Sequence, residues 1–226
     1  MKVIDLCSGL GGFSQAFLDR GHEVIRIDND SRFKDVPFTI IEDIRNIRDL
    51  NIGDVDVMLM SPPCNHFSVA SVYLHWDNGI PKNNGTVYAL RIVAWCLDAV
   101  DYLKPRYWVI ENPRGMLRKI LGKPRITTYW ASWGALYYKP TDLWGRFPSN
   151  MIWPHPKDWI KTPRGSSDGV QGSMIHKGAG SGRGGKDMRP SDSALRAKIP
   201  YELSTALCIA IEDEIGEHAR DSIPCI

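Results

Sequence analysis

Short apolar runs recur along the first half of the chain, and each one stops at glycine, proline or a polar residue. The runs occupy residues 2–7, 23–27, 38–41, 55–60 and 107–113. Runs of this length that are rich in valine and isoleucine and bounded by turn residues are typical of buried strands. Helical patterns lie between several of them, so the alternation predicts an α/β fold with a mostly parallel central sheet and helices on both faces.

Three helices are expected to cover this sheet. Residues 13–20 keep helical spacing up to Gly21, and residues 200–215 form an amphipathic pattern near the end of the chain. Residues 86–104 form the third helix, with Thr86 as the expected N-cap. The apolar positions of this helix, which we interpret as sheet-facing core, are Leu90, Val93, Ala94, Leu97 and Val100.

The second half of the chain is less regular. Residues 125–133 and 136–144 are expected to form two further strands around Gly134. Residues 149–190 show little periodicity and many glycines, and their basic residues include Lys177, Arg183, Lys186 and Arg189. A flexible basic segment suits contact with phosphates, and a solvated surface loop explains the same composition equally well.

Composition narrows the class of protein without giving a function. The 226 residues suit one domain, and 43% hydrophobic with 24% charged residues is ordinary for a soluble globular protein. No apolar run approaches the ~20 residues that span a membrane, and the N-terminus lacks a signal peptide's apolar segment. Five cysteines without a Cys-x-x-Cys pair disfavour disulfides or structural zinc and predict a reducing compartment. A net charge of +2 neither requires nor excludes nucleic acid.

Ligand-binding residue types follow the ends of the first three strands. Residues 8–12, Ser-Gly-Leu-Gly-Gly, join a strand to a helix and let the backbone approach a ligand, although a tight turn without a ligand is the alternative. Asp28 lies 19 residues past Gly9, where a carboxylate can accept hydrogen bonds from both hydroxyls of a ribose. Asp30 competes for this role. Asp43 follows the third strand and suits the amino group of adenine.

Two further strand ends carry groups that suit catalysis. Pro62 and Pro63 stop the fourth strand and place Cys64 on a stiff turn, although a free cysteine is more often a small buried hydrophobic residue. Glu111 ends the fifth strand. These strand ends lie at one edge of a parallel sheet, where open α/β sheets bind ligands. Residues 65–85 are expected to form a long mobile loop that acts as a lid.

Taken together, these residues resemble the DNA (cytosine-5) methyltransferase family over about residues 1–115. Residues 5–13 look like its cofactor loop, Pro-Pro-Cys at 62–64 like its nucleophile motif, and Glu-Asn at 111–112 like its Glu-Asn motif. The resemblance implies the Rossmann-like fold of class I S-adenosylmethionine-dependent methyltransferases. It also implies S-adenosylmethionine as cofactor, DNA (duplex or single-stranded) as partner, no membrane, and a monomer in the cytoplasm of a prokaryotic cell or phage-infected host.

The resemblance also implies roles for individual residues. Cys64 and Glu111 are the expected catalytic residues. The expected cofactor-binding residues are Asp5, Leu6, Gly9, Gly11, Gly12, Phe13, Asp28, Asn29, Asp43, Ile44, Ser61 and Pro63. The expected substrate-binding residues are Ser68, Asn112, Lys139, Arg183 and Arg196. No metal ligand is expected.

The reaction explains why these groups are needed together. Addition of the Cys64 thiolate to carbon 6 of a flipped cytosine makes carbon 5 nucleophilic, and Glu111 relieves the charge that develops on the ring. A free thiol has a pKa near ~8.5, so Cys64 needs a neighbouring positive charge or oriented N–H groups to react at neutral pH. Lys139 and Arg196 are the candidates for that charge.

Parts of the family pattern are missing. Pro113 follows Glu-Asn where the family has valine, Gln-x-Arg-x-Arg has no clean counterpart, and a Gly-Asn motif near the methionine part of the cofactor is absent. The last departure leaves open a modified cofactor, carboxy-S-adenosylmethionine, that transfers a larger group. We expect residues 1–148 with 191–226 to form the catalytic domain and residues 149–190 to form a minimal target-recognition insert.

Other interpretations stay open beside this one. They are the same chemistry on RNA, a non-catalytic nucleic-acid-binding or nucleotide-binding module, and a nicotinamide-dependent oxidoreductase. The Pro-Pro-Cys and Glu-Asn motifs disfavour the oxidoreductase. A metal site of Cys64, His66 and His75 has compatible spacing but lacks further ligands.

Overall fold

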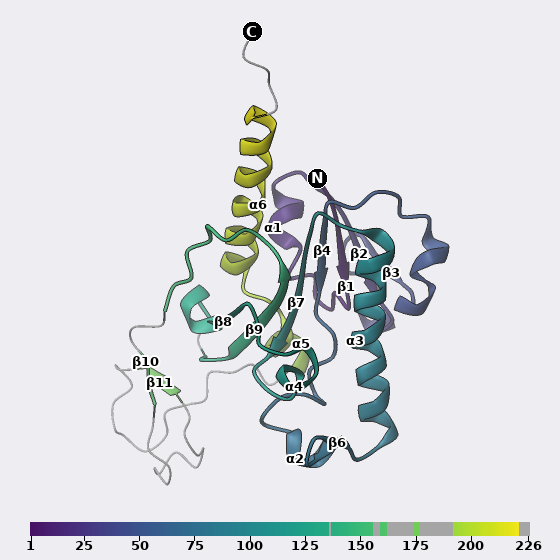
Figure 1. Ribbon diagram of the computed structural model, residues 1–226, viewed down its shortest axis with the longest axis vertical. Coiled ribbons are helices and arrows are strands. Elements are labelled where there is room, and N and C mark those ends of the chain that lie inside the picture. The colour runs from purple at the N-terminus through teal and green to yellow at the C-terminus, as the bar shows by residue number, and fades with distance from the viewer. Residues whose placement is uncertain (136, 156–158, 162–173, 177–191, 222–226) are drawn as a thin grey trace.

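A seven-stranded sheet forms the centre of the protein (Figure 1). The computed structural model describes residues 1–135, 137–155, 159–161, 174–176 and 192–221. The sheet has the order β3-β2-β1-β4-β7-β9-β8, with β1 Lys2–Leu6, β2 Glu23–Asp28, β3 Thr39–Ile41, β4 Val57–Met60, β7 Tyr107–Pro113, β8 Ile126–Tyr129 and β9 Pro140–Arg146. Strands β3, β2, β1, β4 and β7 are parallel, and β9 is antiparallel to both of its neighbours.

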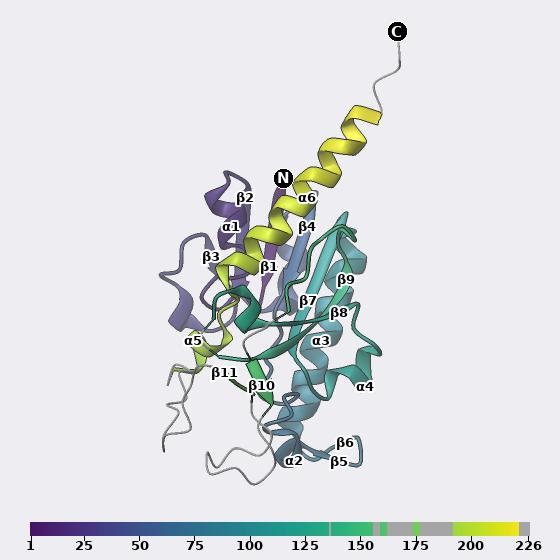
Figure 2. The same ribbon diagram turned by 90° about the vertical axis from the view of Figure 1, so that its left-hand side faces the viewer.

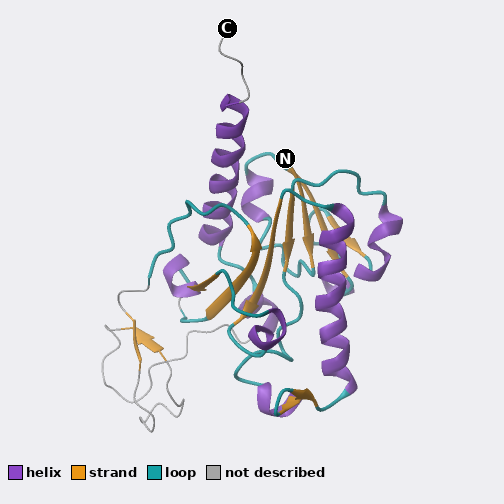
Figure 3. Cartoon of the chain, viewed as in Figure 1, coloured by secondary structure: helices purple, strands orange, loops and turns teal. Residues whose placement is uncertain are grey.

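Helices lie on both faces of this sheet, which confirms the expected α/β architecture (Figure 3). The α-helices are α1 Gln15–Asp19, α2 Val72–His75, α3 Asn84–Leu103, α4 Leu117–Leu121, α5 Ser193–Ala197 and α6 Tyr201–Asp221, and the 3₁₀ segments are η1 Ser31–Phe33, η2 Ile44–Leu50 and η3 Trp130–Trp133. Two small hairpins pair β5 Trp76–Asp77 with β6 Ile80–Pro81 and β10 Trp159–Lys161 with β11 Met174–His176. Within the described ranges, no helix is both long and apolar enough to cross a membrane.

Alternate residues of the central strands face two separate hydrophobic cores. One face buries Leu6 and Met60 together with residues of α3, and the other buries Val3 and Leu59 together with residues of α1 and α6. Figures 1 and 2 show α3 on one side of the sheet and α1 with α6 on the other. Burial on both faces explains why these strands read as continuous apolar runs, and each such side chain contributes about 1.5–3 kcal/mol.

The strand order creates a crevice at the carboxyl ends of β1 and β4. The chain runs outward from β1 to β2 and β3, and it then returns to form β4 on the other side of β1. Leu6 at the end of β1 is in register with Met60 at the end of β4. Connections that leave two neighbouring strands in opposite directions open a space between them, which is where doubly wound sheets bind ligands.

Helix α3 differs from the prediction at its start and on its buried face. Asn83, not Thr86, is the N-cap, and its side chain accepts a hydrogen bond from the Thr86 backbone N–H at 2.9 Å. Ala94 is exposed and Leu97 is 37% exposed, so their assignment to the core was wrong. The buried residues of α3 are Thr86, Ala89, Ile92, Val93, Cys96 and Ala99. The buried face of α3 includes the small or weakly hydrophobic residues Thr86, Ala89, Cys96 and Ala99, so the apolar pattern did not indicate it.

Residues 65–85 are folded, so the expectation of an unpacked loop was wrong. They contain α2 and the β5–β6 hairpin, whose turn at Asn78 and Gly79 has positive φ at both residues. Phe67 and Trp76 are buried, and the Trp76 indole N–H donates to the His66 carbonyl at 2.6 Å. Phe67 and Trp76 therefore anchor this segment in the hydrophobic core between the sheet and α3.

The second half of the chain confirms two further strands but shortens the first. Residues 130–133 turn into η3 instead of continuing β8, and β9 then runs back alongside β7. The predicted insert at residues 149–190 lies mostly outside the described residues, and so does its basic cluster. Its role in target recognition stays a prediction.

Candidate functional site

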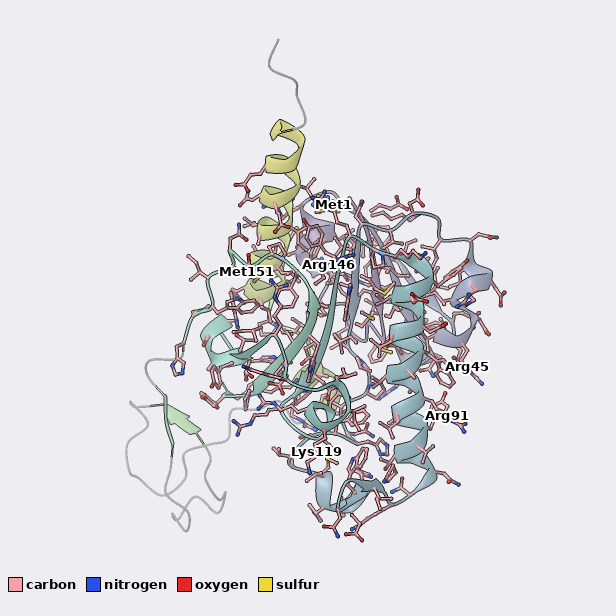
Figure 4. The ribbon with its side chains drawn as sticks, in the orientation of Figure 1. Met1, Arg45, Arg91, Lys119, Arg146 and Met151 are labelled. Atoms are coloured by element: carbon pink, nitrogen blue, oxygen red, sulfur yellow. The ribbon has the colours of Figure 1, made fainter. Side chains whose placement is uncertain are left out.

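A pocket opens at the carboxyl ends of the parallel strands, with a volume of about 1130 Å³ that includes the solvent at its mouth. In Figure 1 this edge lies toward α4 and α5, and Figure 4 places Lys119 toward the same end and Met1 and Arg146 toward the other. The predicted site residues that line the pocket are Gly9, Gly12, Phe13, Asp28, Asn29, Asp43, Ile44, Ser61, Pro63, Cys64, Glu111 and Lys139. The fold therefore brings most of the predicted site together.

The glycine loop is held against the end of β2. Gly9 has a φ of +52°, and its N–H donates to Oδ2 of Asp28 at 2.8 Å. Oδ1 of Asp28 accepts from the N–H of Asp30 at 2.9 Å. Burial raises the pKa of Asp28, and these two N–H groups oppose that effect. Asp30 also lines the pocket, but its carboxylate caps η1 and forms an ion pair with Arg32.

Asp43 lies at the pocket and caps the next helical segment. One carboxylate oxygen accepts from the Arg45 backbone N–H at 2.9 Å, and the other forms an ion pair with the Arg45 side chain at 2.8 Å. The Arg45 side chain is the largest cause that holds the pKa of Asp43 below its ordinary value. Asp43 is therefore a fixed carboxylate with acceptor capacity left for a ligand.

A buried arginine that the sequence analysis did not single out braces the glycine loop. The Arg26 guanidinium in β2 donates to Ser14 Oγ at 2.9 Å, to the Gly11 carbonyl at 3.1 Å and to the Pro37 carbonyl at 2.9 Å. A Cβ atom at Gly11 would lie 2.5 Å from Arg26 Cζ, so this position needs glycine. The available signal was a charged residue inside an apolar strand, since arginine is rarely buried without partners.

Three predicted cofactor residues lie behind the pocket and not in its lining. Asp5 is fully buried, accepts from Ser14 Oγ at 2.7 Å, and has its pKa raised to about 7, chiefly by burial. Leu6 packs in the core beneath α3. Gly11 faces Arg26. Their position supports the loop, and direct contact with a cofactor stays a prediction.

The turn after β4 is tied to the end of β7. The Asn112 side-chain amide donates to the Pro62 carbonyl at 2.9 Å, and Ser68 pairs with Gly115 in a short antiparallel bridge. Because β4 and β7 are parallel neighbours, these bonds hold Cys64 beside the Glu-Asn motif. Asn112 is fully buried beneath the turn, which makes its observed role structural.

Lys139, just before β9, brings a largely buried positive charge to the same place. Its Nζ lies 4.0 Å from Oε1 of Glu111, donates to the Arg196 carbonyl at 3.2 Å, and sits 3.4 Å from the centroid of the Trp130 ring. Burial lowers the pKa of Lys139, whereas the negative charges of Glu111 and Cys64 raise it. Lys139 is therefore a cation held by carbonyl and ring contacts next to the candidate catalytic residues.

Burial favours the neutral forms of both candidate catalytic residues. Burial raises the pKa of Cys64, the positive charges of Lys139 and Arg196 lower it, and the charge of Glu111 raises it. Burial also raises the pKa of Glu111, and Lys139 is the first group that opposes this. A protonated Glu111 can donate a proton, and Lys139 is the stronger of the two cations expected to favour a Cys64 thiolate. The remaining predicted residue, Arg183, lies outside the described residues.

Two hydroxyl groups in the pocket suit a polar cofactor. The Oγ atoms of Ser8 and Ser61 are buried and have no hydrogen-bond partner among the residues that the structure describes, and both serines line the pocket. Together with the carboxylate of Asp28 and the glycine loop, they form a donor and acceptor set that fits the nucleoside of S-adenosylmethionine.

The metal site that the sequence left open does not form among the described residues. The rings of His66 and His75 are tilted by 50° with centroids 4.2 Å apart, and these residues make no three-residue cluster with Cys64. The cluster with metal-binding atoms within 4.8 Å of one another is His22, Cys208 and Glu212. It lies outside the pocket lining, and its carboxylate is already paired with Arg20.

A comparison with protein families agrees with this geometry. The profile of the C-5 cytosine-specific DNA methylase family matches residues 1–128, which is more than half of the 226 residues. The chain belongs to the C-5 cytosine-specific DNA methylase family. The matched range contains the glycine loop, Cys64 and Glu111, whereas Lys139 and the residues after it lie beyond the range. The resemblance noted in the sequence is thereby confirmed.

Curated relatives in this methylase family match the first half of the chain. The type II methyltransferase M.DdeI of Desulfomicrobium norvegicum is 30% identical over 129 residues, which cover 52% of this chain and 29% of that protein. A tRNA (cytosine(38)-C(5))-methyltransferase of Spodoptera frugiperda is 32% identical over 127 residues, covering 50% of this chain and 36% of that protein. The matches thus span about a third of each relative.

A solved structure supports the fold over nearly the whole chain. A methyltransferase from Entamoeba histolytica aligns with 95% of this chain and 98% of that chain, with a TM-score of 0.50 at 14% identity. This likeness concerns the arrangement of strands and helices. It agrees with the Rossmann-like sheet described above.

Proposed function

We propose that this family member transfers a methyl group from S-adenosylmethionine to carbon 5 of a flipped cytosine in DNA through a covalent adduct with Cys64. The observation that carries the proposal is the meeting of a thiol, a carboxyl and an ammonium group in one pocket beside the glycine loop. These groups belong to Cys64, Glu111 and Lys139. We further propose that the protein acts as a monomer.

Residues at the strand ends would hold the cofactor. Asp28 offers its carboxylate to the ribose hydroxyls, Asp43 offers an acceptor to the adenine amino group, and Ser8 and Ser61 offer unpaired hydroxyls. S-adenosylmethionine supplies an electrophilic methyl group when it is bound. The transfer of a larger group from the carboxy form is the alternative for the same pocket.

Each side chain around Cys64 would have its own role in the reaction. The Cys64 thiolate adds to carbon 6 of cytosine, so that a carbon–sulfur bond forms and electron density moves toward carbon 5 and the ring nitrogen. Lys139 favours the thiolate over the thiol and offsets the negative charge of the ring, and Glu111 donates a proton to ring nitrogen 3. After the transfer, a water molecule removes the proton from carbon 5 and Cys64 leaves as a thiolate by elimination.

Trapping on a modified base tests this proposal. DNA that carries 5-fluorocytosine blocks the elimination step, because carbon 5 then holds a fluorine in place of the proton that a base must remove. With S-adenosylmethionine present, wild type should form a covalent complex that resists denaturing electrophoresis, and Cys64→Ala should form none. Cys7→Ala, which removes the other cysteine of the pocket, is the matched control and should still form the complex. A wild type that gives no complex would count against the enzymatic proposal and favour a non-catalytic binding module.

RNA is a second candidate substrate, because one relative is named as a tRNA methyltransferase. The same trap on a 5-fluorocytosine RNA strand of identical sequence distinguishes the two substrates by the yield of complex. A second substrate carries ordinary cytosine in place of 5-fluorocytosine. Mass spectrometry of this substrate after the reaction measures the mass of the transferred group, which separates methyl from carboxymethyl transfer.

A further inference from the structure

We propose that Lys198 binds the carboxylate at the amino-acid end of the cofactor and thereby selects ligands that carry this group. The inference rests on the proposed function, since it assigns one more contact to the cofactor that the pocket would hold. It concerns a residue beyond the range matched by the family profile, in the part of the chain where the Gly-Asn motif is missing.

The backbone around Lys198 is fixed against the glycine loop. A Cβ atom at Gly12 would lie 2.7 Å from the Ile199 carbonyl oxygen and 2.8 Å from Cγ of Lys198, so residues 198–199 pack directly on this glycine. On the other side, the Arg196 carbonyl accepts from Lys139. The segment is therefore held at both ends, and Lys198 lies between these contacts with its side chain in the pocket lining.

The charged residues of the pocket are mostly acidic, and Lys198 is a basic residue that can bind an anionic group. Five acidic residues line the described pocket, whereas its basic residues are Lys139 and Lys198. Lys139 is largely buried, and its ammonium already faces the Glu111 carboxyl, contacts the Trp130 ring and donates to the Arg196 carbonyl. Lys198 is exposed and lines the pocket, and among the described residues its ammonium makes no hydrogen bond or ion pair. It is thus the cation of the pocket that a ligand can use.

The chemistry of the cofactor matches this distribution. An S-adenosylmethionine molecule carries a sulfonium and an ammonium group, which suit an acidic pocket, and a single carboxylate, which does not. With the ribose at Asp28 and the chain of the cofactor passing along the glycine loop, the carboxylate would need a cation near Gly12. Lys198 packs on Gly12 and supplies that cation.

A second source of carboxylate exists in the carboxy form of the cofactor, which has one carboxylate on the transferred group and one at the amino-acid end. The packing of Lys198 on Gly12 favours the amino-acid end, because the transferred group must lie near Cys64 and Glu111, where Lys139 is already located. An experiment that uses ligands with and without each carboxylate separates the two sources.

Calorimetric binding to the whole chain tests the inference without any need for activity. The ligands are S-adenosylhomocysteine, which keeps the amino-acid end, and 5′-methylthioadenosine, which lacks it. Lys198→Met should weaken S-adenosylhomocysteine by about tenfold, as expected for the loss of one charge-assisted contact, and should leave 5′-methylthioadenosine unchanged. Lys198→Arg should keep most of the affinity. Lys119→Met is the matched control for an exposed lysine outside the pocket lining and should change neither ligand.

The possible outcomes separate this inference from the proposed function. Equal losses for both ligands, or no loss for either, would overturn the role of Lys198 while leaving the cofactor site intact. Carboxy-S-adenosylmethionine is the third ligand, and a loss seen with it but not with S-adenosylhomocysteine would move the contact to the transferred group and overturn the assignment to the amino-acid end. A wild-type chain that binds no adenosyl ligand would overturn the proposed function and this inference together.

Discussion

At the scale of single residues, the most informative side chain is Lys139. It stands next to Cys64 and Glu111 in a member of a family whose Gln-x-Arg-x-Arg motif has no clean counterpart here. A guanidinium stays charged at every working pH, whereas a buried lysine with a lowered pKa can lose its proton. The charge that favours the Cys64 thiolate is therefore itself sensitive to pH.

Alkylation of Cys64 measures this effect directly. Lys139→Met removes the largest of the causes that lower the pKa of Cys64, so the thiol pKa should rise and the thiolate fraction below that pKa should fall. The rate of reaction with iodoacetamide at pH 8 should drop by roughly two- to tenfold, because the thiolate is the reactive form. The pH midpoint of the alkylation reaction should move upward. Mass spectrometry of the Cys64 peptide monitors the extent of alkylation. Lys139→Arg keeps the positive charge and is the control, which should retain the fast reaction at pH 8. Identical pH profiles for all three proteins would contradict the assignment.

Residues differ in how far the sequence alone could place them. Gly9, Asp28, Cys64 and Glu111 lie at or near the carboxyl ends of strands, so local patterns were enough to predict their common edge. Lys139 reaches the pocket only because β9 runs back beside β7, and no local pattern gives that pairing. Its position could be named as a candidate from the sequence but not chosen over that of Arg196.

At the scale of elements, β2 does more than carry Asp28. Its residue Arg26 joins this strand to the glycine loop, to the start of α1 and to the segment before β3. A charged residue inside an apolar strand was the signal of a special role, but the partners of Arg26, two backbone carbonyls and two side chains, could not be read from the sequence. The face of α3 was misjudged for a related reason, since Cys96 and Thr86 contribute little to an apolar pattern although both are buried.

Removal of the Arg26 guanidinium should weaken cofactor binding as well as stability. Arg26→Met leaves the Gly11 carbonyl without its donor and Asp5 without its nearby cation, so we expect the free energy of unfolding to fall by roughly 3 kcal/mol. The affinity for S-adenosylhomocysteine should fall by about tenfold, because the loop loses its fixed shape. Urea denaturation and calorimetry give the two quantities.

A second arginine outside the pocket provides the control for this test. Arg125 donates to the Phe147 carbonyl and stacks on the Phe147 ring. Arg125→Met should lower stability without a change in ligand affinity. If Arg26→Met behaved in the same way, Arg26 would be a purely structural residue.

At the scale of the whole molecule, residues from opposite ends of the chain share one core. Leu203, Leu207 and Ile211 of α6 are fully or almost fully buried with Phe17 of α1. The alternation of strands and helices in the first half could be predicted, because each element has a hydrophobic pattern that is recognisable within a few residues. The docking of α6 on α1 could not, since an amphipathic helix does not specify which face of a sheet it covers.

This shared core predicts cooperative unfolding of residues 1–148 with the closing helix. Leu207→Ala should lower the free energy of unfolding by about 2–5 kcal/mol, because it opens a cavity between α6 and the sheet. Far-ultraviolet circular dichroism and tryptophan fluorescence should follow the same single transition in urea. Ile209→Ala, on the exposed side of the same helix, should cost much less. Two separate transitions would show that the closing helix is not part of the predicted catalytic domain.

The close packing of Gly12 against Ile199 has a consequence for how the protein is made. The glycine loop and Cys64 leave the ribosome before the wall that completes their pocket, because Ile199 follows them in the chain. A growing chain that has not reached Ile199 would therefore carry the candidate nucleophile without a complete pocket. The proposed methyl transfer is in this sense withheld until translation has passed residue 199.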